Sequence, residues 1–309
     1  MRNNRLRIGA RNDGVPHHAD IAVNGRFSVL CLWTLIALPM GLVIAADLQL
    51  IPDAVEPGER FVVRVVPAAN RDVAEVRASV LGNPVKFYPR AHTWKGLAAI
   101  NAGAQVKDTP VYVKVFYKDG TSFQDIVTVG IRPKRFPTQN IRMSSSKTGL
   151  MDPGLLRQER EQLYSHLANS QPEPLWNGAF IAPCTGRNVS SFGRRRYVNG
   201  AWWGQHSGAD IACATGTPAK ADNAGIIVLA ETLQMRGNTI VIDHGFNVFS
   251  LYNHLSSIHV EIGDSVQKEE VVGKAGATGF VTGPHLHWEI RIGTIPVNPW
   301  TWTQGELVL

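Results

Sequence analysis

Two kinds of residue are scarce in this sequence, and each scarcity excludes a class of protein. There are three cysteines in 309 residues, which excludes a small domain held together by many disulfides. Charged residues make up 18%, which is too sparse for a surface that coats nucleic acid, although the net charge is +6. The chain is not poor in apolar residues, which make up 44%, so a wholly disordered chain is also excluded. Its length favours about two globular domains.

One long run without charge stands out at residues 27–46, which read FSVLCLWTLIALPMGLVIAA. Twenty apolar residues are about what one helix needs to cross a bilayer. The preceding tail, residues 1–26, holds five arginines against two aspartates, so that end should stay cytoplasmic and the rest should be exported to the periplasm or cell envelope. Ile44-Ala45-Ala46 is compatible with signal-peptidase cleavage, so a retained membrane anchor and a cleaved signal are both open.

Export affects how the cysteines are interpreted. Cys31 lies in the apolar run, which leaves Cys184 and Cys213 in a compartment where disulfides persist. The sequence does not give the distance between them. One bridge and two separate buried thiols therefore remain equal alternatives.

Residues 47–133 have the pattern of a small β-sandwich of immunoglobulin-like topology. Residues 61–66 read FVVRVV, and apolar residues alternate with polar ones over residues 73–81. The run VYVKVFY, residues 111–117, leads through an Asp-Gly turn into SFQDIVTVGI, which predicts a hairpin. This region shows no catalytic group of residues, so a spacer or binding role is the default.

Residues 134–175 form a connector with one predicted helix. Asp152 is the expected N-cap, Pro153 the first helical residue, and the helix should run to about Asn169. Residues 176–302 are again rich in short β-runs between glycines, and most of the histidines lie there. The sequence therefore places the chemistry in this last region.

Two short motifs in the last region have the spacing of metal ligands. His206 and Asp210 are four residues apart, and the glycine between them favours a loop that enters a strand rather than a helix. His285 and His287 alternate in a β-like run, so both imidazoles should project from one face. Two histidines and one aspartate suit Zn²⁺, and three protein ligands leave a position at which the metal can activate water.

These motifs and the text around them resemble the lysostaphin-type, or LytM-type, zinc metallopeptidases that cut peptidoglycan peptides. The matching segments are the HSGAD run that starts at His206, the YNHL run that contains His254, and the HLH run from His285 to His287. The surrounding text GNTIVIDHG (237–245) and GATGFVTGPHLHWEIR (276–291) matches as well. The resemblance covers roughly residues 176–300 and leaves the N-terminal half unmatched.

The resemblance implies an antiparallel β-sheet domain with a substrate groove and a zinc ion held by His206, Asp210 and His287. It leaves His254 and His285 free to act on the substrate, and which of them is the general base stays open. The implied function is a zinc-dependent endopeptidase that hydrolyses peptide cross-links or stem peptides of peptidoglycan through a metal-activated water. The alternative is a catalytically silent wall-binding module that activates another hydrolase.

Several neighbouring residues carry weaker expectations. Tyr252 lies two residues from His254, and a role at the oxyanion and a structural role are both open. Residues 194–196 are three arginines for which a solvated turn is favoured over contact with anionic wall polymer. The connector could block the groove. The bond that is cut, the role of the sandwich and the oligomeric state are not determined by the sequence.

Overall fold

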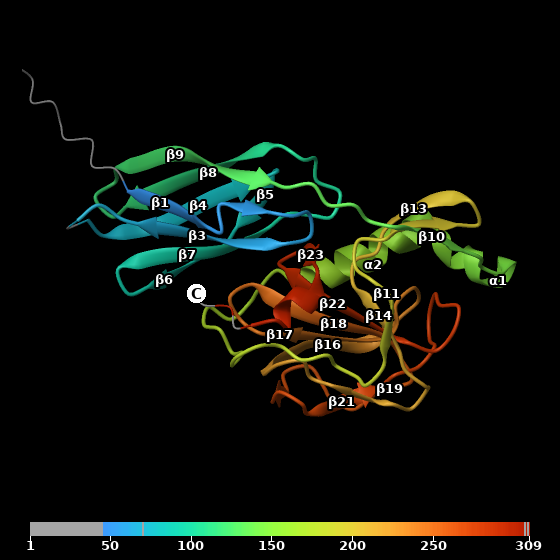
Figure 1. Cartoon of the computed structure of the whole chain (residues 1–309). Coiled ribbons are helices and arrows are strands. Elements are labelled where there is room, and N and C mark those ends of the chain that lie inside the picture. The colour runs from blue at the N-terminus through green and yellow to red at the C-terminus, as the bar shows by residue number, and fades with distance from the viewer. Residues whose placement is uncertain (1–45, 70, 306, 308) are drawn as a thin grey trace, which may run out of the picture. The chain divides into compact units, whose positions relative to one another are not determined.

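The computed structural model describes residues 46–309, except residues 70, 306 and 308. The predicted basic tail, residues 1–26, and the predicted export segment, residues 27–46, lie outside the described residues apart from Ala46. None of the helices in the described part of the chain is long and apolar enough to cross a membrane. The predicted mostly-β class is confirmed, because strands dominate both halves of the described chain (Figure 1).

The strands between residues 47 and 131 form two sheets that share one apolar core. The four-stranded sheet has the order β1-β3-β7-β6, and the five-stranded sheet has the order β2-β9-β8-β4-β5. Valines of β3 and β8 meet in this core, and on β8 they alternate with partly or fully exposed residues, as period-two strands require. The strands are β1 (Asp47–Ile51), β2 (Ala54–Val55), β3 (Arg60–Val66), β4 (Val73–Val80), β5 (Asn83–Val85), β6 (Phe87–Arg90), β7 (Thr93–Ala99), β8 (Asp108–Tyr117) and β9 (Ser122–Ile131).

The predicted hairpin is confirmed by the pairing of β8 with β9. The two strands are antiparallel, and the last pair before the turn is Phe116 with Ser122. Gly120 of the Asp-Gly turn has φ 86°, a left-handed conformation that glycine adopts without steric cost. Two sheets around one core agree with the predicted sandwich, while its immunoglobulin-like topology stays a prediction.

The connector contains one strand and one helix of substantial length. The helix begins where expected, because the Asp152 carboxylate accepts a hydrogen bond from the Leu155 N–H at 2.8 Å. It ends at His166, three residues before the predicted end. Beyond the helix, Ser170 and the Gln171 N–H donate to the buried Asp243 carboxylate, which draws the chain onto the sheet. The elements are β10 (Thr138–Ile141), α1 (Ser145–Thr148), the 3-10 turn η1 (Gly149–Met151) and α2 (Pro153–His166).

The last region is built on an antiparallel sheet with the order β11-β14-β22-β18-β17-β16-β20, and β23 also pairs with β22. Two three-stranded sheets, β10-β12-β13 and β15-β21-β19, accompany it. The connector strand β10 thus belongs to a sheet of the last region, paired in parallel with β12. The elements are β11 (Arg187–Ser190), β12 (Arg195–Val198), β13 (Ala201–Gln205), β14 (Ala209–Ala212), β15 (Pro218–Lys220), β16 (Gly225–Leu233), β17 (Gly237–Asp243), β18 (Val248–Leu255), β19 (Ser257–Ile258), β20 (Ser265–Val266), β21 (Val271–Lys274), β22 (Leu286–Ile292), β23 (Ile295–Val297) and η2 (Pro299–Trp302).

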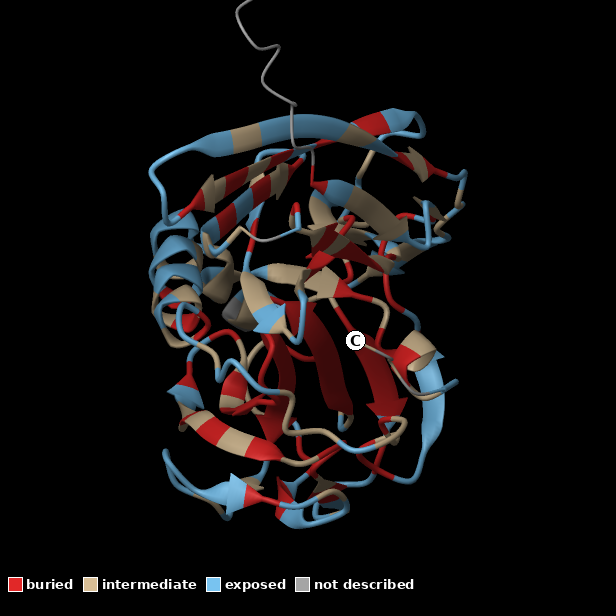
Figure 2. Cartoon of the chain, turned by 90° about the vertical axis from the view of Figure 1, so that its left-hand side faces the viewer, coloured by how far each residue is buried: buried red, intermediate tan, exposed pale blue. Residues whose placement is uncertain are grey.

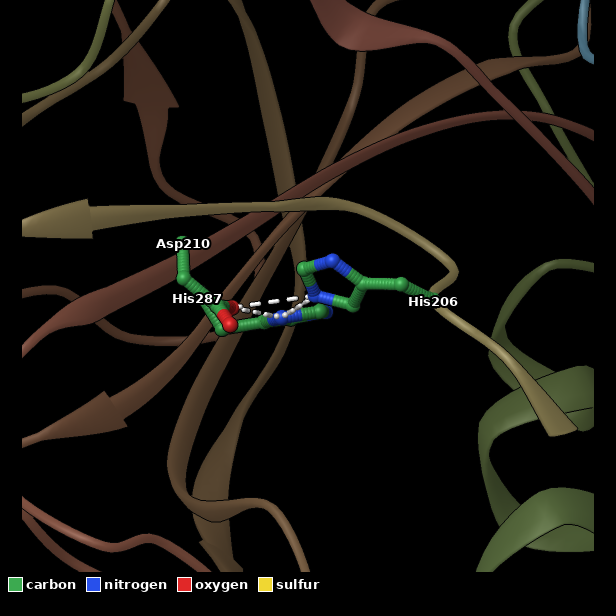
Figure 3. A group of neighbouring side chains, drawn as sticks. All are labelled: His206, Asp210 and His287. Carbon is green, nitrogen blue, oxygen red and sulfur yellow. Dashed lines mark hydrogen bonds and ion pairs between the residues drawn. The ribbon is translucent and has the colours of Figure 1, made fainter. Parts of the chain in front are cut away.

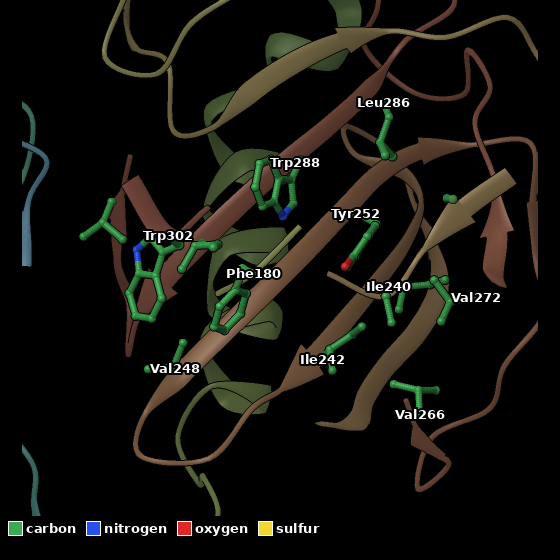
Figure 4. Packing of buried hydrophobic residues seen from close by; sticks show 14 of the residues in the cluster. Phe180, Ile240, Ile242, Val248, Tyr252, Val266, Val272, Leu286, Trp288 and Trp302 are labelled. Atoms are coloured by element: carbon green, nitrogen blue, oxygen red, sulfur yellow. The ribbon is translucent and has the colours of Figure 1, made fainter. Parts of the chain in front are cut away.

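The central strands of this sheet are covered on both faces. All residues of β18 and β22 are buried, and the centre of the sheet is correspondingly red in Figure 2. One face packs on α2 through Leu163, and the other face holds a core that includes Tyr252, Trp288 and Trp302 (Figure 4). The Cys184–Cys213 disulfide lies in that second core, which answers the question that the sequence left open. A rigid, doubly covered sheet is a suitable support for a site at its strand ends.

Candidate active site

Strand pairing brings the two predicted motifs together. Asp210 on β14 lies opposite His287 on β22, and His287 in turn lies opposite Asn253 on β18. His206 precedes β14 in the loop after β13, as the glycine in its motif predicts. These contacts join residues that are far apart in the sequence, so they depend on the register of the sheet rather than on local sequence.

Three side-chain atoms converge where these strands meet (Figure 3). The Asp210 Oδ1 atom lies 3.0 Å from His206 Nε2 and 2.8 Å from His287 Nδ1, and the two nitrogens lie 3.0 Å apart. All three residues are buried. Their ligand atoms lie close enough together to hold one metal ion.

The outward nitrogens of the two imidazoles have partners that fix their hydrogens. His206 Nδ1 lies 3.0 Å from the carbonyl oxygen of Ser191, and His287 Nε2 lies 2.9 Å from a carboxylate oxygen of Glu289. Because those partners accept hydrogen bonds, the outward nitrogens carry the hydrogens and the inward nitrogens present lone pairs. Three acceptors that face one another at about 3 Å are stabilised by a shared cation, so the donor set fits Zn²⁺.

Glu289 is a further residue at the candidate site, beyond the five that the sequence motifs predict. It is 1% exposed and receives a hydrogen bond from Ser207 at 2.8 Å, while Arg291 donates to its other oxygen at 2.7 Å. Glu289 follows His287 by two residues on the same strand, so the alternation that paired His285 with His287 also pointed to it. It orients a proposed ligand from behind, as carboxylates commonly do at zinc sites.

Arg196 is not in a solvated turn, as the sequence analysis had favoured, but on β12 beside the site. Its guanidinium forms an ion pair with Asp210 Oδ2 and donates to Ser190 and, from Nε, to Gln139 of the connector. The expectation failed because β12 alternates: Arg195 is exposed, whereas the side chain of Arg196 is 18% exposed and faces the site. Asp210 therefore has separate partners for its two oxygens.

The remaining two predicted residues, His254 and His285, lie beside the same group. Their ring centroids are 5.0 Å apart, and His285 Nε2 is 3.7 Å from Asp210 Oδ1. His254 Nδ1 lies 2.9 Å from the carbonyl oxygen of Thr278, and His285 Nδ1 lies 2.8 Å from that of Gly283. By the same reasoning, each ring holds its hydrogen on Nδ1 and leaves the Nε2 lone pair free to accept a proton or a hydrogen bond.

Burial keeps most of these groups in the form that metal binding and base catalysis need. Burial lowers the pKa of His206 to about 4, and it also lowers the pKa values of His254 and His285, so these rings are neutral at neutral pH. Burial opposes ionisation of Asp210 as well, but attraction to His206 and His287 outweighs it and holds its pKa well below the ordinary value. For His287 in the metal-free protein, the hydrogen bonds that the protonated ring makes to Asp210 and Glu289 outweigh burial and raise the pKa.

The group opens on a small cavity of about 100 Å³. One wall carries Arg196, Asp210, His254 and His285. The rest of the lining includes Trp203, Phe280 and the connector residues Gln139 and Met143. The connector is thus part of the wall of the site, and whether it blocks the groove stays a prediction.

Tyr252 does not face the site. It is fully buried, and its hydroxyl donates to Asp222 at 2.7 Å and accepts from the Asp222 N–H at 2.7 Å. Ser250 and the Trp288 indole donate to the same carboxylate. Of the two roles that the sequence left open, the structural one agrees with this geometry, because the hydroxyl has no free bond to offer an oxyanion.

Comparison with known proteins gives the same assignment for this region. The sequence profile of Peptidase family M23 matches residues 204–299, which contain all five candidate residues. The chain is 41% identical over 123 residues to the DD-carboxypeptidase/endopeptidase Mpg of Neisseria meningitidis, which covers 40% of this chain and 28% of that protein. It is 41% identical over 93 residues to the peptidoglycan DD-endopeptidase ShyA of Vibrio cholerae, covering 30% and 22%. The chain thus spans less than a third of the length of these curated relatives.

A crystal structure from Pseudomonas aeruginosa described as a peptidase M23 superimposes with a TM-score of 0.57 at 26% identity, covering 80% of this chain and 93% of that one. Residues 204–299 therefore resemble peptidase family M23 in sequence, and the structure brings the buried His-Asp-His group together within that region.

Proposed function

We propose that this chain is a zinc-dependent endopeptidase that hydrolyses peptide cross-links or stem peptides of peptidoglycan in the cell envelope. The observation that carries the proposal is the convergence of three inward-facing acceptors, His206 Nε2, Asp210 Oδ1 and His287 Nδ1. Their outward atoms are already bound to Ser191, Arg196 and Glu289, so the set is oriented before any ion arrives.

His206, Asp210 and His287 would hold the metal, and zinc bound there would polarise the scissile carbonyl and lower the pKa of water. His254 and His285 line the cavity beside them. Their Nδ1 atoms are occupied by backbone carbonyls, so each can accept a proton or orient a peptide group through Nε2. Their lowered pKa values keep that nitrogen unprotonated at neutral pH.

The substrate class follows from the named relatives, of which ShyA is a peptidoglycan DD-endopeptidase. The Cys184–Cys213 bridge supports an extracytoplasmic location, because disulfides persist in oxidising compartments. Export through residues 27–46 remains the prediction made from the sequence. We also propose the division into a β-sandwich (47–133), a connector (134–175) and a catalytic region (176–302). A silent wall-binding role is less favoured, because all five candidate side chains are present and brought together.

The purified chain should bind about one zinc ion and release peptide fragments from purified peptidoglycan sacculi, with release stopped by a chelator and restored by zinc. Fragment masses would identify the bond that is cut. His287→Ala should lose both zinc and hydrolysis, whereas the exposed His259→Ala should lose neither. Zinc binding without hydrolysis of sacculi of any wall type would instead support the binding module, and full activity of His287→Ala would refute the ligand assignment.

A further inference from the structure

The connector helix α2 is fixed to the sheet that carries the site, although it precedes the region that matches the family. Leu163 and Leu167 are buried against a satellite core formed by Leu229, Val241, Phe249 and Leu251 of β16, β17 and β18. Gln162 also donates to Glu231 of β16 at 2.8 Å. The helix is therefore packed against β18, the strand that contains His254.

Glu159 lies on the same buried side of α2 and is 4% exposed. Its Oε1 atom accepts a hydrogen bond from the Met235 N–H at 2.7 Å, and its Oε2 atom lies 4.0 Å from the Arg236 guanidinium. Met235 and Arg236 belong to the turn between β16 and β17, which we call the 234–236 turn. A buried carboxylate is costly unless it is paired, so this contact fixes the turn and the helix together.

The 234–236 turn holds His254 by two routes. The Arg236 carbonyl accepts a hydrogen bond from the His254 N–H at 2.8 Å. The Met235 carbonyl accepts a hydrogen bond from the Phe280 N–H at 2.8 Å, which fixes the loop that holds residues 278–280. In that loop, the Thr278 carbonyl accepts a hydrogen bond from His254 Nδ1. Both the backbone and the ring of His254 are therefore positioned from this turn.

His254 needs such support because its backbone is unusual. Its φ is 66°, a left-handed conformation that is uncommon for a residue with a side chain and persists when the surroundings over-determine it. The turn and the 278–280 loop also approach closely: a Cβ added at Gly279 would lie 2.5 Å from the Met235 carbonyl oxygen. A small shift of the turn would thus be passed to the imidazole.

We propose that Glu159 is a positioning residue for His254, acting through the 234–236 turn, so that the connector helix is a working part of the active site. This inference rests on the proposed function, in which His254 acts on the substrate. Without the carboxylate, the Met235 N–H loses its acceptor, the turn relaxes and the His254 ring leaves its productive position. A displacement of about 1 Å in a catalytic group can lower the rate about a hundredfold.

The test compares four variants of the full chain on cross-linked muropeptide dimers. Glu159→Ala should lower kcat about tenfold or more with KM within about twofold and zinc content unchanged. Glu159→Gln keeps an oxygen that can accept from the Met235 N–H, so it should retain most of kcat. The exposed Glu161→Ala on the same helix should match the wild type. Leu163→Ala should lower the unfolding midpoint without lowering kcat of the folded protein, which separates positioning from stability.

Amide hydrogen exchange gives a readout that does not require turnover. Exchange at the His254 N–H should be faster in Glu159→Ala than in Leu163→Ala measured under conditions of equal global stability. An unchanged kcat and unchanged exchange in Glu159→Ala would overturn the inference, and so would a loss in Glu159→Gln as large as that in Glu159→Ala. If the wild type cleaved no substrate, the proposed function would fail, while the exchange comparison would still decide whether Glu159 positions His254.

Discussion

The Nε2 atom of His287 lies 2.9 Å from Glu289, and this contact sets which nitrogen of His287 faces Asp210. Replacing Glu289 with glutamine removes the charge behind the imidazole and the partner of Arg291. We expect Glu289→Gln to weaken zinc binding about tenfold to a hundredfold, as loss of such outer partners does at other sites. Competition with a chromophoric chelator at pH 7.5 measures the change. The exposed Glu261→Gln is the control, and a Glu289→Gln affinity within about twofold of wild type would contradict the role given to Glu289.

The stability of the metal-free protein should depend on pH in two opposite ways. The lowered pKa values of His206, His254 and His285 let the unfolded chain bind protons that the folded chain does not, so stability falls as the pH drops below 6.5. The contribution of His206 is lost by about pH 4. The raised pKa of His287 has the opposite effect: its contribution is complete below about pH 6.5 and is lost as the pH rises through the raised value. The free energy of unfolding should therefore be greatest between about pH 6.5 and the raised pKa of His287.

Urea denaturation of chelator-treated protein across this pH range would check the shape of the curve. In Glu289→Gln, one interaction that raises the pKa of His287 is weakened, so the fall above pH 6.5 should shrink. A free energy of unfolding that kept rising with pH to 8 in the wild type would be incompatible with the raised pKa of His287.

Arg196→Met should destabilise the protein, because it leaves Asp210 Oδ2 without its ion-pair partner in a largely buried site. A hydrogen bond to a charged group contributes about 2 kcal/mol, and we expect a loss of that order in the free energy of unfolding. Arg195→Met, on the exposed side of the same strand, should cost about 0.5 kcal/mol or less. Equal losses in the two variants would show that the buried ion pair does not stabilise the site.

The parts of the site that were predictable are those that depend on local spacing. The alternation of His285 and His287 indicates a strand, and β22 begins between them at Leu286. The glycine within the 206–210 motif indicates a loop, and a loop joins β13 to β14 there. That same alternation extends to Glu289, although a lone glutamate on a strand usually faces solvent. The mostly-β class was also predictable, since turn residues separate short β-runs throughout both halves.

The other features depend on non-local packing, which one sequence does not reveal. In the sequence, Arg196 is one of three adjacent arginines with nothing to distinguish it. Its ion pair with Asp210 depends on where β12 lies in the folded protein, where it pairs with β10. The helix was predictable from Asp152 and Pro153, but its early end depends on bonds from residues 170–171 to Asp243. Whether Cys184 and Cys213 meet depends on a core assembled from the whole sheet.

His254→Ala should separate catalysis from metal binding. The imidazole lies beside the proposed ligands but its free nitrogen is not one of the three converging atoms, so zinc content should stay near one per chain. Loss of a general acid or base lowers turnover about a hundredfold to ten-thousandfold, and we expect a fall in that range for peptide release. The exposed His259→Ala serves as the matched control. A variant that lost zinc in parallel with activity would move His254 into the ligand set.

Tyr252→Phe distinguishes a structural tyrosine from a catalytic one. The hydroxyl is one of three donors to the fully buried Asp222 carboxylate and the acceptor for the Asp222 N–H, so its removal leaves buried polar groups unpaired. Such a loss costs about 1–3 kcal/mol, which should lower the free energy of unfolding by that amount while kcat stays within about twofold. An oxyanion donor behaves differently, because its removal lowers kcat about a hundredfold to a thousandfold without a comparable loss of stability. Denaturation and turnover of the same preparation decide between them: a hundredfold fall in kcat at wild-type stability would mean that Tyr252 reaches the substrate by a rearrangement of the core.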